Sequence, residues 1–269
     1  MIKVIDVDVL FDKYISDYVY GNIGKVKPEE IENKIPELYL EFGDTKLKEL
    51  GGKTPNEYYK SFSAEELIDC LKKHLEKGVA VSDFLCEAIT CDKKNEDALT
   101  NALSKENDEE FILYLMNMLG ELGSNKPLRR YLEFIAWDYS EPIKELATEL
   151  LKEMAEQVKE EVLALFAEVT DGIKAYLTEI LSGCKNDDRV FDILVAEFMK
   201  RQDNVPIYAG YLAKYGDERA LPFLMASIER ENISYADFEE LRFAIEALGG
   251  EYKKERDFSK DKTYKRIKN

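Results

Sequence analysis

The stretch that decides the fold is Gly216-Asp217-Glu218-Arg219-Ala220-Leu221-Pro222-Phe223-Leu224. A glycine permits a tight left-handed turn after one helix, and an aspartate directly after it can cap the next helix. The run from Asp217 to Ala226 aligns with the run from Asp187 to Ala196, thirty residues earlier. The repeated unit is a helix, a turn with glycine, an acidic cap and a second helix, so we expect a stack of helix pairs.

Helical patterns extend outward from this unit in both directions. Residues 211–218 align with residues 245–251 at an offset of 34, which predicts a second copy of the glycine turn. Apolar residues between 143 and 158 follow the helical i, i+3, i+4, i+7 spacing, either in one long helix or in two with a break near Gln157. Because no run alternates polar and apolar residues for long, we predict an all-α chain, an α-solenoid (superhelix) of antiparallel helix pairs.

The Gly216–Leu224 segment resembles the turn and second helix of HEAT-like repeats, of the type found in phycobilisome-lyase-related proteins. The resemblance is good in this unit, fair over residues 170–201, only suggestive over 104–168, and not visible in 1–100. It implies an array of stacked helix pairs with a long curved surface. After Gly250 a polar segment replaces the expected apolar helix, as in the terminal repeat of a solenoid, so we expect the array to end there.

Three segments follow from these patterns. Residues 1–62, where tyrosines cluster, are expected to form an N-terminal helical cap or subdomain, and residues 63–250 the HEAT-like repeats. Residues 251–269 form a basic tail with eight basic and four acidic side chains on an otherwise acidic chain. This tail could dock back on the body or bind an acidic partner, but its composition favours a solvated, disordered end.

Charge and cysteine content narrow the classes of function. A net charge of -17 argues against a nucleic-acid partner, because phosphate binding requires clustered lysine and arginine. The sequence contains no apolar run of about 18 residues, so no membrane span is expected, and its first residues lack the apolar core of a signal peptide. The four cysteines form no CxxC pair, which predicts reduced thiols and a cytoplasmic location.

No motif predicts catalysis, a cofactor or a metal. Val4–Asp8 resembles the start of an aspartate-nucleophile phosphatase, but no α/β alternation follows it. Gly52-Lys53-Thr54 ends like a phosphate-binding loop, but Leu47 stands where that motif needs glycine. His74 is the only histidine and is expected at the surface among lysines, while Cys86 and Cys91 are expected to pack in the core.

The candidate partner-binding residues form two groups: Arg129, Arg130, Trp137 and Tyr139, and the acidic pair Glu145 and Glu149. Tryptophan, tyrosine and arginine are enriched at interface hot spots, although core packing is the favoured reading for Trp137. The two glutamates belong to a like-charged stripe that could dock a basic partner or the chain's own tail, or could simply be a solvated face.

The function that fits these observations is a scaffold that binds a protein or peptide. The alternative is an enzyme or nucleic-acid repair protein on a HEAT-like scaffold, similar to the HEAT-like DNA-alkylation glycosylases. That family uses aromatic residues and an aspartate in a basic groove, so it would need Trp137, Asp138, Arg129 and Arg130 to converge on one cleft. The net charge disfavours it.

Overall fold

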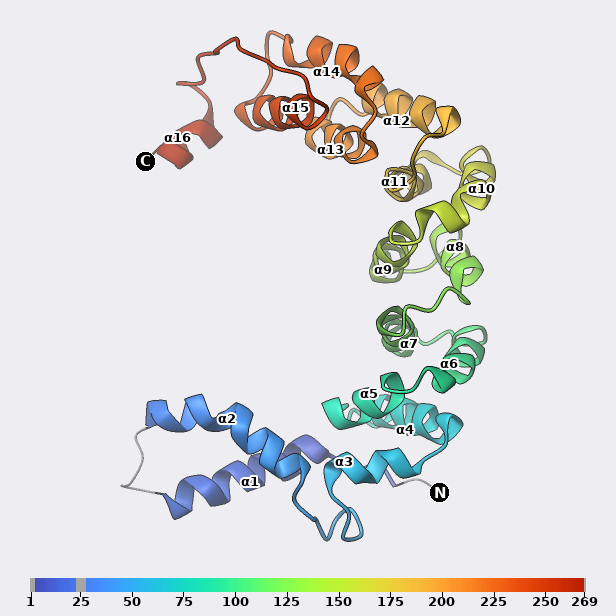
Figure 1. The fold of residues 1–269 in the computed structure, drawn as a ribbon, viewed down its shortest axis with the longest axis vertical. Coiled ribbons are helices and arrows are strands. Elements are labelled where there is room, and N and C mark those ends of the chain that lie inside the picture. Colours follow the sequence, from blue (N-terminus) through green and yellow to red (C-terminus); the bar gives the residue numbers. More distant parts are fainter. Residues whose placement is uncertain (1–2, 23–27, 269) are drawn as a thin grey trace. The chain divides into compact units, whose positions relative to one another are not determined.

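The structure is a computed structural model that describes residues 3–22 and 28–268. These residues form sixteen α-helices, three short 3₁₀ helices and their connections, without a strand. The chain divides into two compact units, Met1–Pro127 and Leu128–Asn269, called unit 1 and unit 2 below. The helices pack against their neighbours in chain order, which is the arrangement of an α-solenoid and confirms the predicted fold class (Figure 1).

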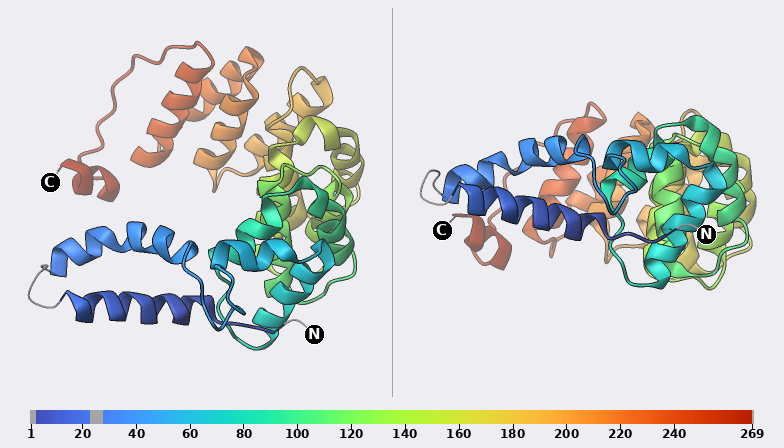
Figure 2. Two further views of the ribbon diagram at one scale, coloured as in Figure 1. Left: turned by 60° about the horizontal axis from the view of Figure 1, so that its bottom comes forward. Right: turned by 90° about the horizontal axis from the view of Figure 1, so that it is seen from below.

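Unit 1 contains seven α-helices. They are α1 (Val7–Gly21), α2 (Pro28–Gly43), α3 (Pro55–Tyr58), α4 (Ala64–Glu76), α5 (Asp83–Thr90), α6 (Glu96–Leu103) and α7 (Glu109–Glu121). Helices α1 and α2 lie side by side as a hairpin (Figure 2). Helix α4 packs with α5, α6 and α7. The hairpin joins the rest of the unit through aromatic side chains, because Phe42 and Tyr39 of α2 contact Phe84 of α5.

The predicted helix starts are observed. Thr54 and Ser63 each accept the backbone N–H three residues on, while Glu57 and Glu66 reach back to the N–H of the cap. Two otherwise unsatisfied donors are therefore paired at each start, as the capping box requires.

Unit 2 contains α8 (Leu128–Ala136), α9 (Glu141–Lys152), α10 (Ala155–Phe166), α11 (Asp171–Leu181), α12 (Asp188–Lys200), α13 (Val205–Tyr215), α14 (Leu221–Ile228), α15 (Tyr235–Ala247) and α16 (Lys262–Lys268). Helices α8 to α15 pack as four successive pairs. Within this unit α8, α10, α12 and α14 form one layer, and α9, α11, α13 and α15 form a second layer on the inside of its curve (Figure 1). The apolar stretch from 143 to 158 forms two helices, which separate at Met154, where the backbone leaves the helical region.

The turn that decides the fold has the same geometry at Asp187 and Asp217. Both aspartates are extended, with ψ of 114° and 116°, and each accepts the backbone N–H two residues on, at 3.0 and 2.9 Å. Each also pairs with the arginine at that position, Arg189 or Arg219. The local repeat predicted at an offset of thirty residues is therefore present in the structure.

The aspartate cap of this turn recurs in unit 1, where no repeat was predicted, although Cys91 before it has φ of -69° whereas Asn186 and Gly216 are left-handed. Asp92 has φ of -124° and ψ of 114°, accepts the N–H of Lys94 at 2.9 Å, and pairs with its ammonium group at 3.6 Å. The residue seven positions after each aspartate is a buried leucine: Leu99, Leu194 and Leu224. The same aspartate cap, followed by a buried leucine, therefore occurs in both halves of the chain.

The second copy of the glycine turn is present, but it is displaced by one residue from its predicted position. Gly216 and Gly249 adopt the left-handed conformation, with φ of 81° and 79°, so the offset between equivalent turns is 33 rather than 34. Gly250 has another role, because a Cβ there would lie 2.7 Å from Leu221 Cδ2. The chain approaches α14 closely at this point, so a side chain is excluded.

Residues 251–268 are not a free solvated end, and the expectation of a disordered tail is wrong. Phe258 packs against Tyr235 and Phe238 of α15, and Tyr252 also contacts Phe238. Lys254 pairs with Glu229 at 2.5 Å, which joins the start of the tail to the end of α14. Aromatic packing and two ion pairs to Glu229, from Lys254 and from Arg256 at 3.8 Å, thus hold the tail on the last helix pair.

Candidate partner-binding surface

Arg130 has a structural role at the turn between α8 and α9. Its guanidinium donates to Glu133 at 3.1 Å and to the Tyr139 hydroxyl at 3.1 Å, and it lies 4.5 Å above the Phe134 ring. Tyr139 packs edge-on against the same Phe134 ring. These contacts fix the turn to α8, so Arg130 and Tyr139 shape the surface instead of offering free groups to a partner.

Trp137 and Arg129 are the exposed members of this group. Trp137 is 60% exposed at the end of α8, so the favoured reading of a core tryptophan is wrong. The Arg129 side chain is 94% exposed and makes only a 3.7 Å pair with Glu133, one helical turn away. The exposed indole is a large apolar contact area beside a rigid turn, which is typical of an interface residue.

The predicted acidic stripe lies on α9. Glu141, Glu145 and Glu149 are all exposed, in the second layer of unit 2. Glu149 pairs with Lys152 at 2.7 Å, and Lys152 also pairs with Glu179 of α11 at 2.8 Å. This network reduces the repulsion between the carboxylates while leaving Glu145 without an ion pair among the described residues.

Two tyrosines extend this network to neighbouring helices. Tyr211 of α13 donates to Glu179 at 3.2 Å, and Tyr176 of α11 donates to Glu141 of α9. Burial, together with the nearby Glu141 carboxylate, raises the pKa of Tyr176 to about 12, and burial beside Glu179 raises the pKa of Tyr211 still further. Both phenols therefore stay neutral donors at physiological pH, and they crosslink the helices of the second layer.

The sequence reasoning missed two exposed apolar residues of the same layer. Phe243 of α15 is 67% exposed, in a shallow hollow that it shares with Glu239, Glu240, Arg242 and Glu246. Ile207 of α13 is also exposed. The sequence does carry a signal that Phe243 is exposed, because this residue lies off the apolar stripe of α15. The buried stripe consists of Phe238, Leu241, Ala244 and Ile245.

The balance of charge on this layer is acidic. Helices α9, α11, α13 and α15 carry nine carboxylates and five cationic side chains. Two of the cations, Lys144 and Lys152, are largely buried and already paired with glutamates of α9. The surface therefore presents net negative charge around its exposed apolar residues.

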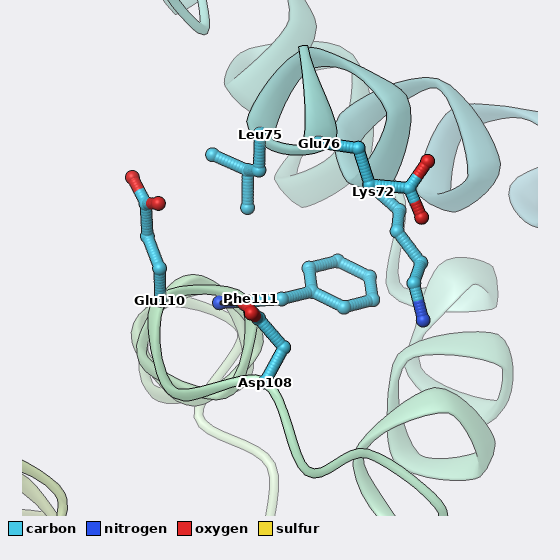
Figure 3. Close-up of a pocket in the computed structure, with 6 residues that line it drawn as sticks. All are labelled: Lys72, Leu75, Glu76, Asp108, Glu110 and Phe111. Atoms are coloured by element: carbon cyan, nitrogen blue, oxygen red, sulfur yellow. Dashed lines mark hydrogen bonds between the residues drawn. The ribbon is translucent and has the colours of Figure 1, made fainter. Parts of the chain in front are cut away.

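A small hollow lies in unit 1 between α4 and α7. Leu75 and Phe111 form its apolar part, with Glu76, Asp108 and Glu110 around them (Figure 3). Lys72 also lines it, but its ammonium group is engaged with Glu106 at 2.7 Å. The hollow measures about 140 Å³. It is smaller than the roughly 300–1,000 Å³ typical of small-molecule sites.

Two sequence-based placements are wrong in unit 1. His74 is only 1% exposed, and its ring nitrogens lie 2.7 Å from the Cys70 carbonyl oxygen and 3.2 Å from that of Ile5. It continues the buried stripe of α4 and ties residue 5 to this helix. Cys91 is exposed, whereas Cys86 is half-buried; Cys70 and Cys184 are buried.

Across the described residues, no group of three or more histidine, cysteine, aspartate or glutamate side chains could hold a metal ion. None of the helices in that part of the chain is long and apolar enough to cross a membrane. No family model matches the chain, and no curated protein matches it.

Proposed function

We propose that this chain is a HEAT-like helical-repeat scaffold that binds a protein or peptide on the second layer of unit 2. The observation that carries the proposal is the exposed Phe243, set among four charged side chains on this layer. Exposing a large apolar side chain to water is unfavourable, and covering it with a partner lowers the free energy of the system. Trp137 and Ile207 add exposed apolar area in and beside the same layer.

The charge of this layer defines the partner's chemistry. Exposed carboxylates such as Glu145 and Glu240 favour lysine and arginine, while Phe243 favours an apolar anchor. A basic segment with one large apolar residue combines both features, and charge complementarity would mainly speed its association. We also propose that the protein acts in the cytoplasm, where its four free thiols would remain reduced.

The alternative of a repair enzyme is less well supported. It needs a basic groove in which Arg129 and Arg130 both reach a substrate. Arg130 is engaged by Glu133 and Tyr139, and the second layer has more carboxylates than cations. Binding of the full chain to duplex DNA at low salt would support this alternative.

The proposal is tested by affinity capture with the immobilised full chain. Phe243→Glu should abolish specific capture, because it places a charge where an apolar anchor is expected, and Trp137→Ala should weaken it. Met199→Glu is the matched control, since Met199 is 49% exposed on α12 in the other layer. Equal loss in the control, or unchanged capture by Phe243→Glu, would contradict the proposal.

A further inference from the structure

The α1–α2 hairpin leaves much of its apolar surface uncovered. Among the described side chains of α1 only Val7 is buried, and in α2 only Leu38 and Phe42 are buried. Leu40 is 72% exposed, and Tyr20 is exposed as well. Two helices alone cannot bury the apolar stripes of both, so a hairpin of this kind is normally covered by a third element.

The hairpin is also strongly acidic. Its two helices carry eight carboxylates and two lysines. The exposed Asp12, Asp17, Glu32, Glu37 and Glu41 form no ion pair in the described part of the chain. Burial and three neighbouring carboxylates raise the pKa of Asp8. A covering element must therefore be cationic, because an acidic or neutral helix would leave this repulsion in place.

Helix α16 has the complementary chemistry. Its sequence contains four basic residues and no acid. Lys262, Lys265 and Arg266 are exposed and form no ion pair within the described residues, and Ile267 beside them is 68% exposed. A short helix with a cationic surface and an exposed isoleucine is the kind of element that the hairpin lacks.

Helix α16 is fixed in position by contacts with α15. Asp261 accepts the backbone N–H groups of Thr263 and Tyr264 at its start, and also that of Tyr235 in α15. The Tyr264 ring packs against Tyr235. The basic side chains are consequently presented outward from a fixed base, which lowers the entropy lost when a partner binds them.

We propose that α16 of one copy of this protein docks on the α1–α2 hairpin of a second copy. The observation that selects a second copy is the charge distribution: residues 251–269 are net basic, whereas the chain as a whole carries -17. Two hairpins facing each other would oppose like charges, so the contact joins unlike surfaces, head to tail. Repeated in one direction, such contacts build rings or open chains, whereas two copies that exchange α16 reciprocally form a closed dimer.

The test is sedimentation velocity of the full chain over a range of concentrations at low salt. Wild type should associate, and Lys265→Glu/Arg266→Glu should weaken this association at least about tenfold, because two attractions become repulsions. Lys93→Glu/Lys105→Glu is the matched control: it changes the net charge equally at two exposed cations that form no ion pair among the described residues, and its association should not fall comparably.

A complementation experiment identifies the two surfaces. Glu37→Lys/Glu41→Lys alone should associate as weakly as Lys265→Glu/Arg266→Glu alone. Mixed with Lys265→Glu/Arg266→Glu, it should form complexes, because each mixture still contains one intact hairpin and one intact α16. A wild type that is monomeric at all concentrations would overturn the proposal, as would association unaffected by either charge reversal.

Discussion

Replacing Asp187 by alanine removes two strong interactions from the repeated turn, and also a looser 3.6 Å pair with Lys159. The first is the helix cap, in which the carboxylate accepts the Arg189 N–H at 3.0 Å. The second is the ion pair with the Arg189 guanidinium at 2.7 Å, and the Asp187 side chain is only 12% exposed there. A cap is worth about 1 kcal/mol. Hydrogen bonds to a charged partner add about 1.5–3 kcal/mol. The Arg189 side chain is 56% exposed, so solvent screening favours the lower end of this range, and we expect a total loss of about 2–3 kcal/mol.

The equivalent turn in unit 1 provides the comparison. Asp92 also caps its helix, but its pair with Lys94 spans 3.6 Å between exposed side chains. Surface ion pairs of this kind contribute little. Asp92→Ala should therefore cost only the cap, about 1 kcal/mol. Urea unfolding followed by circular dichroism measures both losses.

The ionic part of the Asp187 contribution depends on pH in a defined direction. Hydrogen bonds from Arg189 hold the pKa of the Asp187 carboxyl well below its usual range. Its contribution is therefore complete above the unfolded-chain pKa of about 3.9 and declines as pH falls below that value. The difference between wild type and Asp187→Ala should be smaller at pH 3 than at pH 7. Asp187→Asn, which keeps a cap acceptor, should lose less than alanine at pH 7. The reasoning fails if Asp92→Ala costs as much as Asp187→Ala, or if the Asp187→Ala loss grows on acidification.

Three further substitutions test other parts of the fold by the same unfolding measurement. His74→Ala should lower the free energy of unfolding by about 2 kcal/mol, because it leaves a cavity and removes the ring N–H that donates to a buried carbonyl oxygen. The exposed Lys77→Ala should change little, and equal effects would contradict the buried placement of His74. Gly250→Ala should lower the free energy of unfolding by about 1–3 kcal/mol, because its new Cβ clashes with Leu221. Gly172→Ala, whose Cβ would have nothing within 4 Å, should be neutral or slightly stabilising. A Gly250→Ala variant as stable as wild type would refute the close approach. Arg130→Ala should lower the free energy of unfolding by about 1–2 kcal/mol, because its guanidinium stacks on Phe134 and donates to Tyr139. Arg129→Ala should change it very little. The reverse order would show that other contacts hold the turn.

Local signals predicted the helices and their starts well. The capping boxes at Thr54 and Ser63 and the turns at Asp187 and Asp217 each depend on a few adjacent residues, so sequence spacing is sufficient to find them. The cap at Asp92 keeps the same spacing, but cysteine replaces the preceding glycine or asparagine and lysine replaces the arginine, and these substitutions concealed it.

Features set by distant contacts were not predictable in the same way. His74 lies among charged neighbours in sequence, yet it continues the buried stripe of Leu67, Cys70 and Leu71, and its partner Ile5 is far away in the chain. The basic composition of the tail concealed Phe258, whose packing on α15 holds it in place. Exposure of Trp137 and Phe243 depends on which helix faces each neighbour cover, which spacing alone does not reveal.

Site-specific photo-cross-linking tests the proposed binding surface most directly. A benzophenone amino acid placed at Phe243 should cross-link a partner in cells that make the protein, and the same group at Met199, on the other layer, should not. The captured partner should carry lysine or arginine at the cross-linked segment. Cross-linking at Met199 but not at Phe243, or at both equally, would contradict the account that the second layer of unit 2 is the binding surface.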